Sequence, residues 1–221
     1  MNQAYENNKR RIQMFKLTAN VKDDNGVIHH FVDGYECVEI GGIKWATCNV
    51  GAEKETDSGL YFAWGETVGY KDANEKCFIW NDYKFGGRGN TLKYINGLDT
   101  LKPCDDAATV NMGSNWRMPK RDEFNALLSA TTNEWVIDYQ SNGVMGMLFT
   151  DKTDTSKKLF FPAVGYCYNG SVRYMGSNGL YWSNLDTSDI FNGRLLYFNV
   201  ANCYIAVDFS YLGFPVRGVI K

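Results

Sequence analysis

The chain has 221 residues, a formal net charge of −2 and 44% hydrophobic residues, which suits one well-buried domain or one domain with an added arm. The small negative charge argues against a nucleic-acid partner, because nucleic acids bind broad positive surfaces. No apolar run reaches the roughly 18 residues of a membrane span, and the first residues lack the apolar stretch of a secretory signal, so we expect neither membrane insertion nor a standard export signal.

Residues 1–34 predict an N-terminal arm. They are polar at first and then weakly strand-like on both sides of Asp23–Gly26, a turn sequence that predicts a β-hairpin. We expect this arm to attach the protein to a larger assembly or to form homo-oligomers. Residues 35–221 then form the main domain.

Short aromatic and β-branched runs separated by Gly, Asn and Asp follow from Tyr35 onward, and they predict many short strands joined by loops. Two segments predict helices instead. The first is 101–110, where Asp105 and Asp106 supply the N-terminal cap and a first-turn acid.

The second predicted helix is Pro119–Ala130. Pro119 suits a first helical turn, and Phe124, Leu127 and Leu128 fall on one face. The expected fold class is therefore α+β, with two short helices packed on irregular antiparallel β-sheets with long loops.

Candidate catalytic and metal-binding groups are sparse. The six cysteines are too widely spaced for a zinc cluster, so we expect free, mostly buried thiols: Cys37, Cys48, Cys77, Cys104, Cys167 and Cys203. His29 and His30 are interpreted as strand residues near a turn, because no serine or cysteine motif accompanies them. We expect no cofactor and no enzymatic activity.

Seven motifs carry a family resemblance: KWATCNVGA at 44–52, GLYFAWGE at 59–66, DDAA at 105–108, SNWRMPKRDEF at 114–124, FFPAVGY at 160–166, GLYWSN at 179–184 and GFPVR at 213–217. In this order the chain resembles the bacterial major paralogous domain family over about residues 36–221. The resemblance implies a C-type lectin-like fold. It also implies that Trp116, Arg117 and Pro119 are scaffold residues and that Trp182 and Arg217 bracket the C-terminal segment.

Two alternatives accompany this resemblance. The WRMP and GF-x-VR motifs are also distantly similar to the formylglycine-generating enzyme superfamily, which implies reactive cysteines near the C-terminus, where this chain has only Cys203. C-type lectins often hold calcium in acidic loops, for which the candidates are the pair Asp105 and Asp106 or the pair Asp151 and Asp154. The EPN or QPD tripeptide of calcium-dependent sugar-binding lectins is absent.

The segment Ser183–Phe214 has an unusual composition. Its 32 residues contain no Lys, Glu, Gln, Met or Trp, whereas the other 189 residues contain 40 of them. Strand-rich segments are naturally poor in several of these types. The resemblance offers another explanation, because some C-type lectin-like proteins are variable proteins of diversity-generating retroelements. Adenine-specific errors in AAC or AAT template codons cannot produce any of the five missing types, and we favour this explanation.

The resemblance places Gly193, Leu196 and Phe198 at fixed positions of a strand, so the period of two puts Leu195, Tyr197 and Asn199 on its opposite, exposed face. Tyr197 and Tyr211 are expected to be the most exposed aromatic residues. The predicted ligand-binding residues resemble an antibody paratope in composition: Asp186, Thr187, Asp189, Phe191, Leu195, Tyr197, Asn199, Asn202, Tyr204, Asp208, Phe209, Tyr211 and Leu212.

The expected function is recognition of a receptor, either a protein or a glycan on a bacterial cell surface. The resemblance implies a location at the tail tip of a phage particle or on a bacterial surface. The alternatives are a non-diversified adhesin or lectin of the same fold and an enzyme of the formylglycine-generating type.

Overall fold

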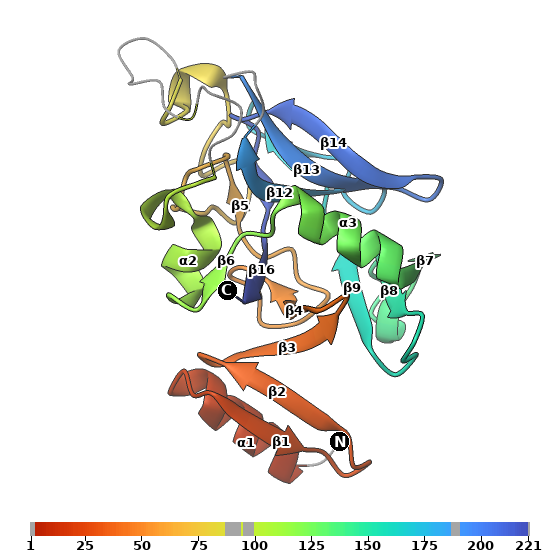
Figure 1. Cartoon of the computed structure of the whole chain (residues 1–221). Helices are drawn as coiled ribbons and strands as arrows, with labels where there is room; N and C mark the ends of the chain where they lie inside the picture. Colours follow the sequence, from red (N-terminus) through yellow and green to blue (C-terminus); the bar gives the residue numbers. More distant parts are fainter. Residues whose placement is uncertain (1–2, 87–93, 95–99, 187–190, 221) are drawn as a thin grey trace.

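The structure is a computed structural model that describes residues 3–86, 94, 100–186 and 191–220. This part of the chain contains the α-helices α1 (Gln3–Met14), α2 (Ala107–Met112) and α3 (Arg121–Ala130) and short 3-10 helices at Trp80–Asp82, Pro103–Asp105 and Tyr139–Ser141. Its strands pair mostly antiparallel in several curled sheets (Figure 1). The α+β class is confirmed, with one α-helix more than expected. No helix in the described ranges is long and apolar enough to cross a bilayer.

The largest sheet joins the N-terminal hairpin to the main domain. Its strands run in the order β1 (Ala19–Lys22), β2 (Ile28–Val32), β3 (Tyr35–Ile40), β4 (Ile43–Asn49), β16 (Arg217–Ile220) and β6 (Trp116–Arg117). The predicted hairpin forms, since Asp23 Oδ1 accepts hydrogen bonds from the backbone N–H groups of Asn25 and Val27 and Gly26 takes a φ of 85°. Because β2 pairs with β3, the hairpin continues the sheet (Figure 1).

Helix α1 was not expected from the sequence. Ile12 is its buried residue, and the helix lies beside β1. The Tyr5 ring lies 4.7 Å from the His29 ring, and Lys9 Nζ lies 3.3 Å from Glu36 Oε2. A short helix with so few apolar residues depends on such tertiary contacts, which a sequence pattern does not reveal.

Helices form in both predicted segments, but each begins later than expected. In the first, a 3-10 turn precedes α2, which runs on to Met112, and in the second Pro119 lies before the N-cap Lys120 and not in the first turn of α3. The Asp106 carboxylate caps α2 by accepting a hydrogen bond from Thr109 N, and α3 buries Phe124 and Leu127. Arg117 pairs with Glu123 in the first turn of α3, which ties the preceding strand β6 to the helix.

The remaining strands form smaller sheets. They are β7 (Thr131–Val136), β8 (Gly146–Asp151) and β9 (Lys158–Pro162); β12 (Gly179–Asp186), β13 (Asn192–Phe198) and β14 (Cys203–Phe209); β10 (Tyr166–Tyr168) and β11 (Ser171–Arg173); and β5 (Tyr61–Phe62) and β15 (Phe214–Pro215). In Figure 1 the sheet of β12, β13 and β14 lies at the end of the molecule opposite the N-terminal hairpin, with α3 against one of its faces.

Two buried clusters form the core, and β13 lies between them. Leu195 belongs to the cluster of Trp116, Trp182 and Phe214, whereas its neighbour Leu196 belongs to the cluster around α3. Side chains alternate across a strand, so the two leucines point to opposite faces, and both faces are covered here. This arrangement decides which positions of the strand remain accessible.

Trp182 and Arg217 hold the C-terminal segment in place. Trp182 Nε1 donates to Phe62 O at 2.7 Å, and the guanidinium of the fully buried Arg217 donates to Asn49 Oδ1, Phe160 O and the backbone carbonyls of Ala46 and Thr47. Burial lowers the pKa of Arg217. Both residues therefore make the internal contacts expected of scaffold residues at the two ends of the C-terminal segment.

Candidate functional site

The hairpin of β13 and β14 carries the predicted binding surface. Its strands pair in register from Asn192 opposite Phe209 to Phe198 opposite Cys203. Leu196 and Phe198 are both fully buried, as expected for fixed positions. Gly193 is also confined, because a Cβ there would lie 2.8 Å from the Trp182 ring.

Leu195 and Leu212 are corrections to the predicted surface. Leu195 does face away from Leu196, but it is 1% exposed because that face of β13 packs on the cluster of Trp182 and Phe214. Leu212 is 5% exposed in the same cluster. Neither leucine can contact a ligand without a change in the fold.

Asn199 forms the turn of the hairpin. Its Oδ1 accepts hydrogen bonds from Ala201 N and Asn202 N, both at 2.9 Å, and its Nδ2 donates to the Tyr197 hydroxyl at 2.8 Å. These bonds engage both polar ends of the side chain. Asn202, at the other end of the turn, is exposed.

The accessible part of the surface is largely aromatic. Tyr204, Phe209 and Phe191 are 50%, 48% and 45% exposed, whereas Tyr197 and Tyr211 are only half-buried. The expectation that Tyr197 and Tyr211 are the most exposed is therefore wrong, since both rings pack on the core cluster below them. Val207, which we did not predict, is 53% exposed on β14.

Three predicted residues cannot be placed in this surface. Thr187 and Asp189 lie outside the described residues, and of Asp186 only the backbone, at the end of β12, belongs to the described part.

Side chains from outside 183–214 extend the aromatic surface. The Trp80 ring lies 5.1 Å from Phe191 and 6.2 Å from Tyr211, and Tyr211 in turn lies 5.2 Å from Phe209. Tyr168, on β10, lies 6.3 Å from Tyr211. We call these five rings the aromatic path. It runs from Phe191 through Trp80 to Tyr211, which has both Phe209 and Tyr168 as neighbours, and it joins three separate parts of the chain.

The hairpin of β10 and β11 is the part that sequence reasoning missed. Its turn is Asn169–Gly170, with φ values of 46° and 70°, and Asn-Gly is the strongest short signal for a tight hairpin. The signal was therefore present between Tyr166 and Arg173. Its proximity to Tyr211 follows only from the tertiary pairing of Cys167 with Gly213.

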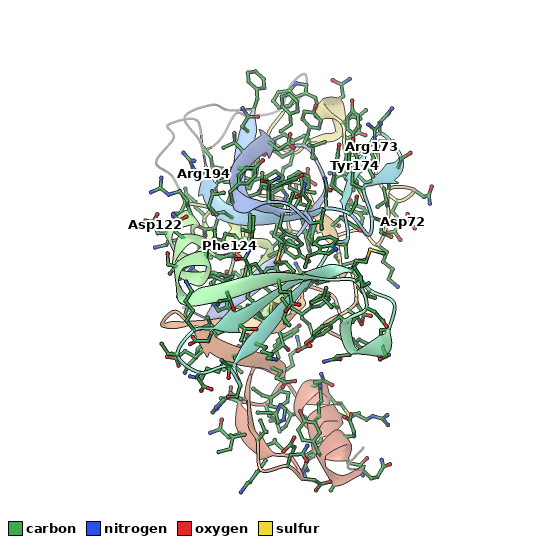
Figure 2. All side chains as sticks on the ribbon, turned by 90° about the vertical axis from the view of Figure 1, so that its right-hand side faces the viewer. Asp72, Asp122, Phe124, Arg173, Tyr174 and Arg194 are labelled. Atoms are coloured by element: carbon green, nitrogen blue, oxygen red, sulfur yellow. The ribbon has the colours of Figure 1, made fainter. Side chains whose placement is uncertain are left out.

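Two charged groups border the aromatic path. The Arg173 guanidinium carbon lies 4.7 Å from the centre of the Tyr168 ring, and Figure 2 shows Arg173 beside Tyr174 at the edge of the molecule. Asp208, on β14, is half-buried, and burial raises the pKa of its carboxyl despite a hydrogen bond from Phe209 N. Burial raises the pKa of Tyr166; the charge of Arg173 lowers it and that of Asp208 raises it.

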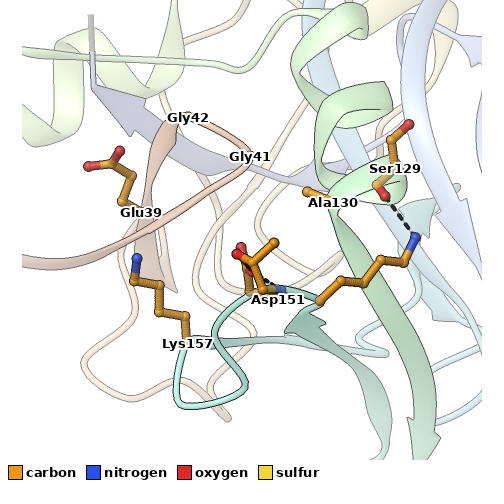
Figure 3. A pocket seen from close by; sticks show the side chains of 9 residues that line it. Glu39, Gly41, Gly42, Ser129, Ala130, Asp151 and Lys157 are labelled. Atoms are coloured by element: carbon orange, nitrogen blue, oxygen red, sulfur yellow. Dashed lines mark hydrogen bonds between the residues drawn. The ribbon is translucent and has the colours of Figure 1, made fainter.

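A hollow of about 420 Å³ lies elsewhere, between the β3–β4 turn and the end of β8 (Figure 3). Lys152 Nζ donates to Ser129 O at 2.7 Å, and Asp151 Oδ1 accepts from Thr153 N at 2.7 Å. Lys152 and Asp151 are thus bonded within the protein, and we assign this hollow no function.

The candidate calcium ligands also have partners within the chain. Asp105 pairs with Lys84 Nζ at 2.7 Å, Asp106 accepts from Thr109 N and Met118 N, and Asp154 accepts from Ser156. Among the described residues, no group of three or more His, Cys, Asp and Glu side chains is arranged to hold a metal ion.

Cysteine and histidine chemistry gives little support to the enzyme alternative. All six cysteines are free thiols, but the expectation that most are buried is wrong: Cys37 and Cys167 are buried, Cys48 and Cys203 are half-buried, and Cys77 and Cys104 are exposed. Burial raises the pKa of Cys203 to about 12, so the thiolate is scarce at neutral pH. His29 Nδ1, on β2, is hydrogen-bonded to Glu36 Oε1, on the neighbouring strand β3, at 2.6 Å.

Comparison of the chain with family models, with curated proteins and with solved structures gives no match.

Proposed function

We propose that this protein is a ligand-recognition protein that presents a replaceable surface on the β13–β14 hairpin. The scaffold is of the C-type lectin-like kind, and the segment 183–214 is diversified by a retroelement. The protein acts by binding and not by catalysis, and it needs no cofactor.

One observation carries the proposal. The segment that lacks five residue types also combines buried framework residues such as Leu196 and Phe198 with exposed ones such as Val207 and Phe209. Replacing an exposed residue usually changes stability by no more than about 0.5 kcal/mol, whereas truncating a buried leucine costs about 2–5 kcal/mol. A surface of this kind tolerates extensive variation without unfolding.

The proposed ligand is a protein or a glycan on a bacterial cell surface, and the proposed setting is a phage tail or a bacterial surface. The N-terminal unit of α1, β1 and β2 would provide attachment to a larger assembly or to further copies of the chain. A non-diversified adhesin of the same fold would share this surface but not its origin.

The DNA that flanks the gene tests the proposal. We expect a near-identical, Asn-codon-rich repeat beside a reverse transcriptase gene, differing from the codons of 183–214 only where the repeat has adenine. Differences at many other bases, or no such repeat in a complete genome, would leave the non-diversified adhesin as the better description.

A further inference from the structure

Arg173 is an exposed cation in a defined position. It ends β11, and its guanidinium lies over the Tyr168 ring, with 4.7 Å between the guanidinium carbon and the ring centre. None of the ion pairs formed among the described residues includes Arg173. The guanidinium also hydrogen-bonds the Tyr166 side chain. Held by a ring and a hydroxyl, it retains further N–H donors and loses less side-chain freedom when it binds a carboxylate.

The position of Arg173 makes it part of the binding surface. The Tyr168 ring, over which the Arg173 guanidinium lies, is 6.3 Å from the Tyr211 ring, and the Tyr211 ring is 5.2 Å from the ring of the half-exposed Phe209. Tyr211 and Phe209 belong to the segment 183–214, whereas Tyr168 and Arg173 do not. If only that segment is replaced, Arg173 is present in every version of the protein.

We propose that Arg173, positioned over Tyr168, is a permanent anchor for an acidic side chain of a protein ligand, while residues of 183–214 select which protein is bound. This inference rests on the proposed function and deepens it, because it assigns a ligand class and divides the surface into a constant and a replaceable part.

The composition of the surface favours a protein over a glycan. Phe191 and Phe209 are 45% and 48% exposed, and their side chains have no polar atoms. They would leave the hydroxyls of a sugar without hydrogen-bond partners, at a cost for each buried hydroxyl. Aromatic residues with a neighbouring arginine are, in contrast, the residue types that dominate protein–protein binding energy.

Charge complementarity favours an acidic contact at Arg173. A carboxylate can take two parallel N–H bonds from one guanidinium, and these bonds strengthen as neighbouring apolar side chains exclude water. The nearby negative charge of Asp208 lies within 183–214 and is itself replaceable. With a net charge of −2 the whole chain does not attract nucleic acid, so a phosphate backbone is a poor ligand for this anchor.

A display library tests the anchor without knowledge of the natural ligand. The whole chain is displayed with Phe191, Tyr204, Asp208 and Phe209 randomised, and it is selected in parallel on a negatively and a positively supercharged form of one green fluorescent protein. Arg173→Glu is then introduced into independent clones of each set. Arg121→Glu is the matched control, because Arg121 is exposed on α3 and pairs with Asp122, which Figure 2 shows on the side of the molecule opposite Arg173.

We expect Arg173→Glu to weaken binders of the negative form by about tenfold or more and the control to weaken them by less than about twofold. Binders of the positive form should keep or gain affinity. The loss of affinity caused by Arg173→Lys should be intermediate, because lysine keeps the positive charge but lacks the planar fork of N–H donors. Thermal unfolding of each variant checks that folding is intact.

Equal losses from Arg173→Glu and Arg121→Glu, or no loss from Arg173→Glu in the binders of the negative form, would overturn the anchor and leave the proposed function standing. A library that folds but gives binders to neither form would overturn both, because the hairpin would then not act as a replaceable surface.

Discussion

Gly193 lies directly against Trp182, so that a Cβ on Gly193 would be 2.8 Å from the Trp182 ring and 3.0 Å from the ring of Trp64. We therefore expect Gly193→Ala to lower the free energy of unfolding by about 1–3 kcal/mol, because neither ring can move without disturbing the core. Urea unfolding followed by tryptophan fluorescence measures this. Ala201→Ser adds one heavy atom at an exposed turn position and should be neutral; equal effects of the two changes would argue against the close contact.

Leu195 and Leu196 should both behave as core residues. Truncation of either to alanine is expected to cost about 2–5 kcal/mol, since each side chain is at most 1% exposed. Val207→Ala, on the neighbouring strand, should cost no more than about 0.5 kcal/mol. Chemical denaturation measures the free energy of unfolding of the three variants. A small decrease for Leu195→Ala would show that Leu195 belongs to the accessible surface after all.

Arg217→Met should be severely destabilising. The substitution keeps much of the side-chain volume but leaves the carbonyls of Ala46, Thr47 and Phe160 and the Asn49 amide oxygen without their donor in the core. We expect a loss of more than about 3 kcal/mol of unfolding free energy. Arg11→Met, at an exposed position of α1, is the control. Similar melting temperatures for the two variants would contradict this role of Arg217.

Asp208→Asn should stabilise the protein in a pH-dependent way. Burial raises the pKa of Asp208 in the folded state above its ordinary value of 3.8, so ionising the carboxyl costs folding free energy as the pH rises through that folded pKa. Asparagine removes this cost. We expect the variant to be more stable than the parent at pH 7, with the difference shrinking as the pH falls toward 3.8. Urea unfolding at both ends of this range checks the sign, and a difference that grows on acidification would contradict it.

Cys203 should react slowly with alkylating reagents, because burial holds its pKa near 12 and little thiolate forms at neutral pH. The exposed Cys77 and Cys104 should be modified first. Limited treatment with iodoacetamide followed by peptide mass spectrometry gives the order. Early modification of Cys203, or an oxidase activity that Cys203→Ser abolishes, would support the enzyme alternative instead.

Local patterns determined a large part of the fold. The turn at Asp23–Gly26, the helix after Pro119 and the alternation that buries Leu196 and Phe198 depend on neighbouring residues, and all of them appear in the structure. The composition of 183–214 likewise marked one segment as unusual before any contact was known.

Tertiary structure alone decided which of those residues a ligand can reach. A period of two shows that Leu195 and Tyr197 share a face, but not that a second cluster covers Leu195. It also gives no sign that Trp80 and Arg173 extend the surface. Burial and proximity arise from elements distant in the chain, so side-chain alternation specified the faces of the strand and the packing of distant segments specified the site.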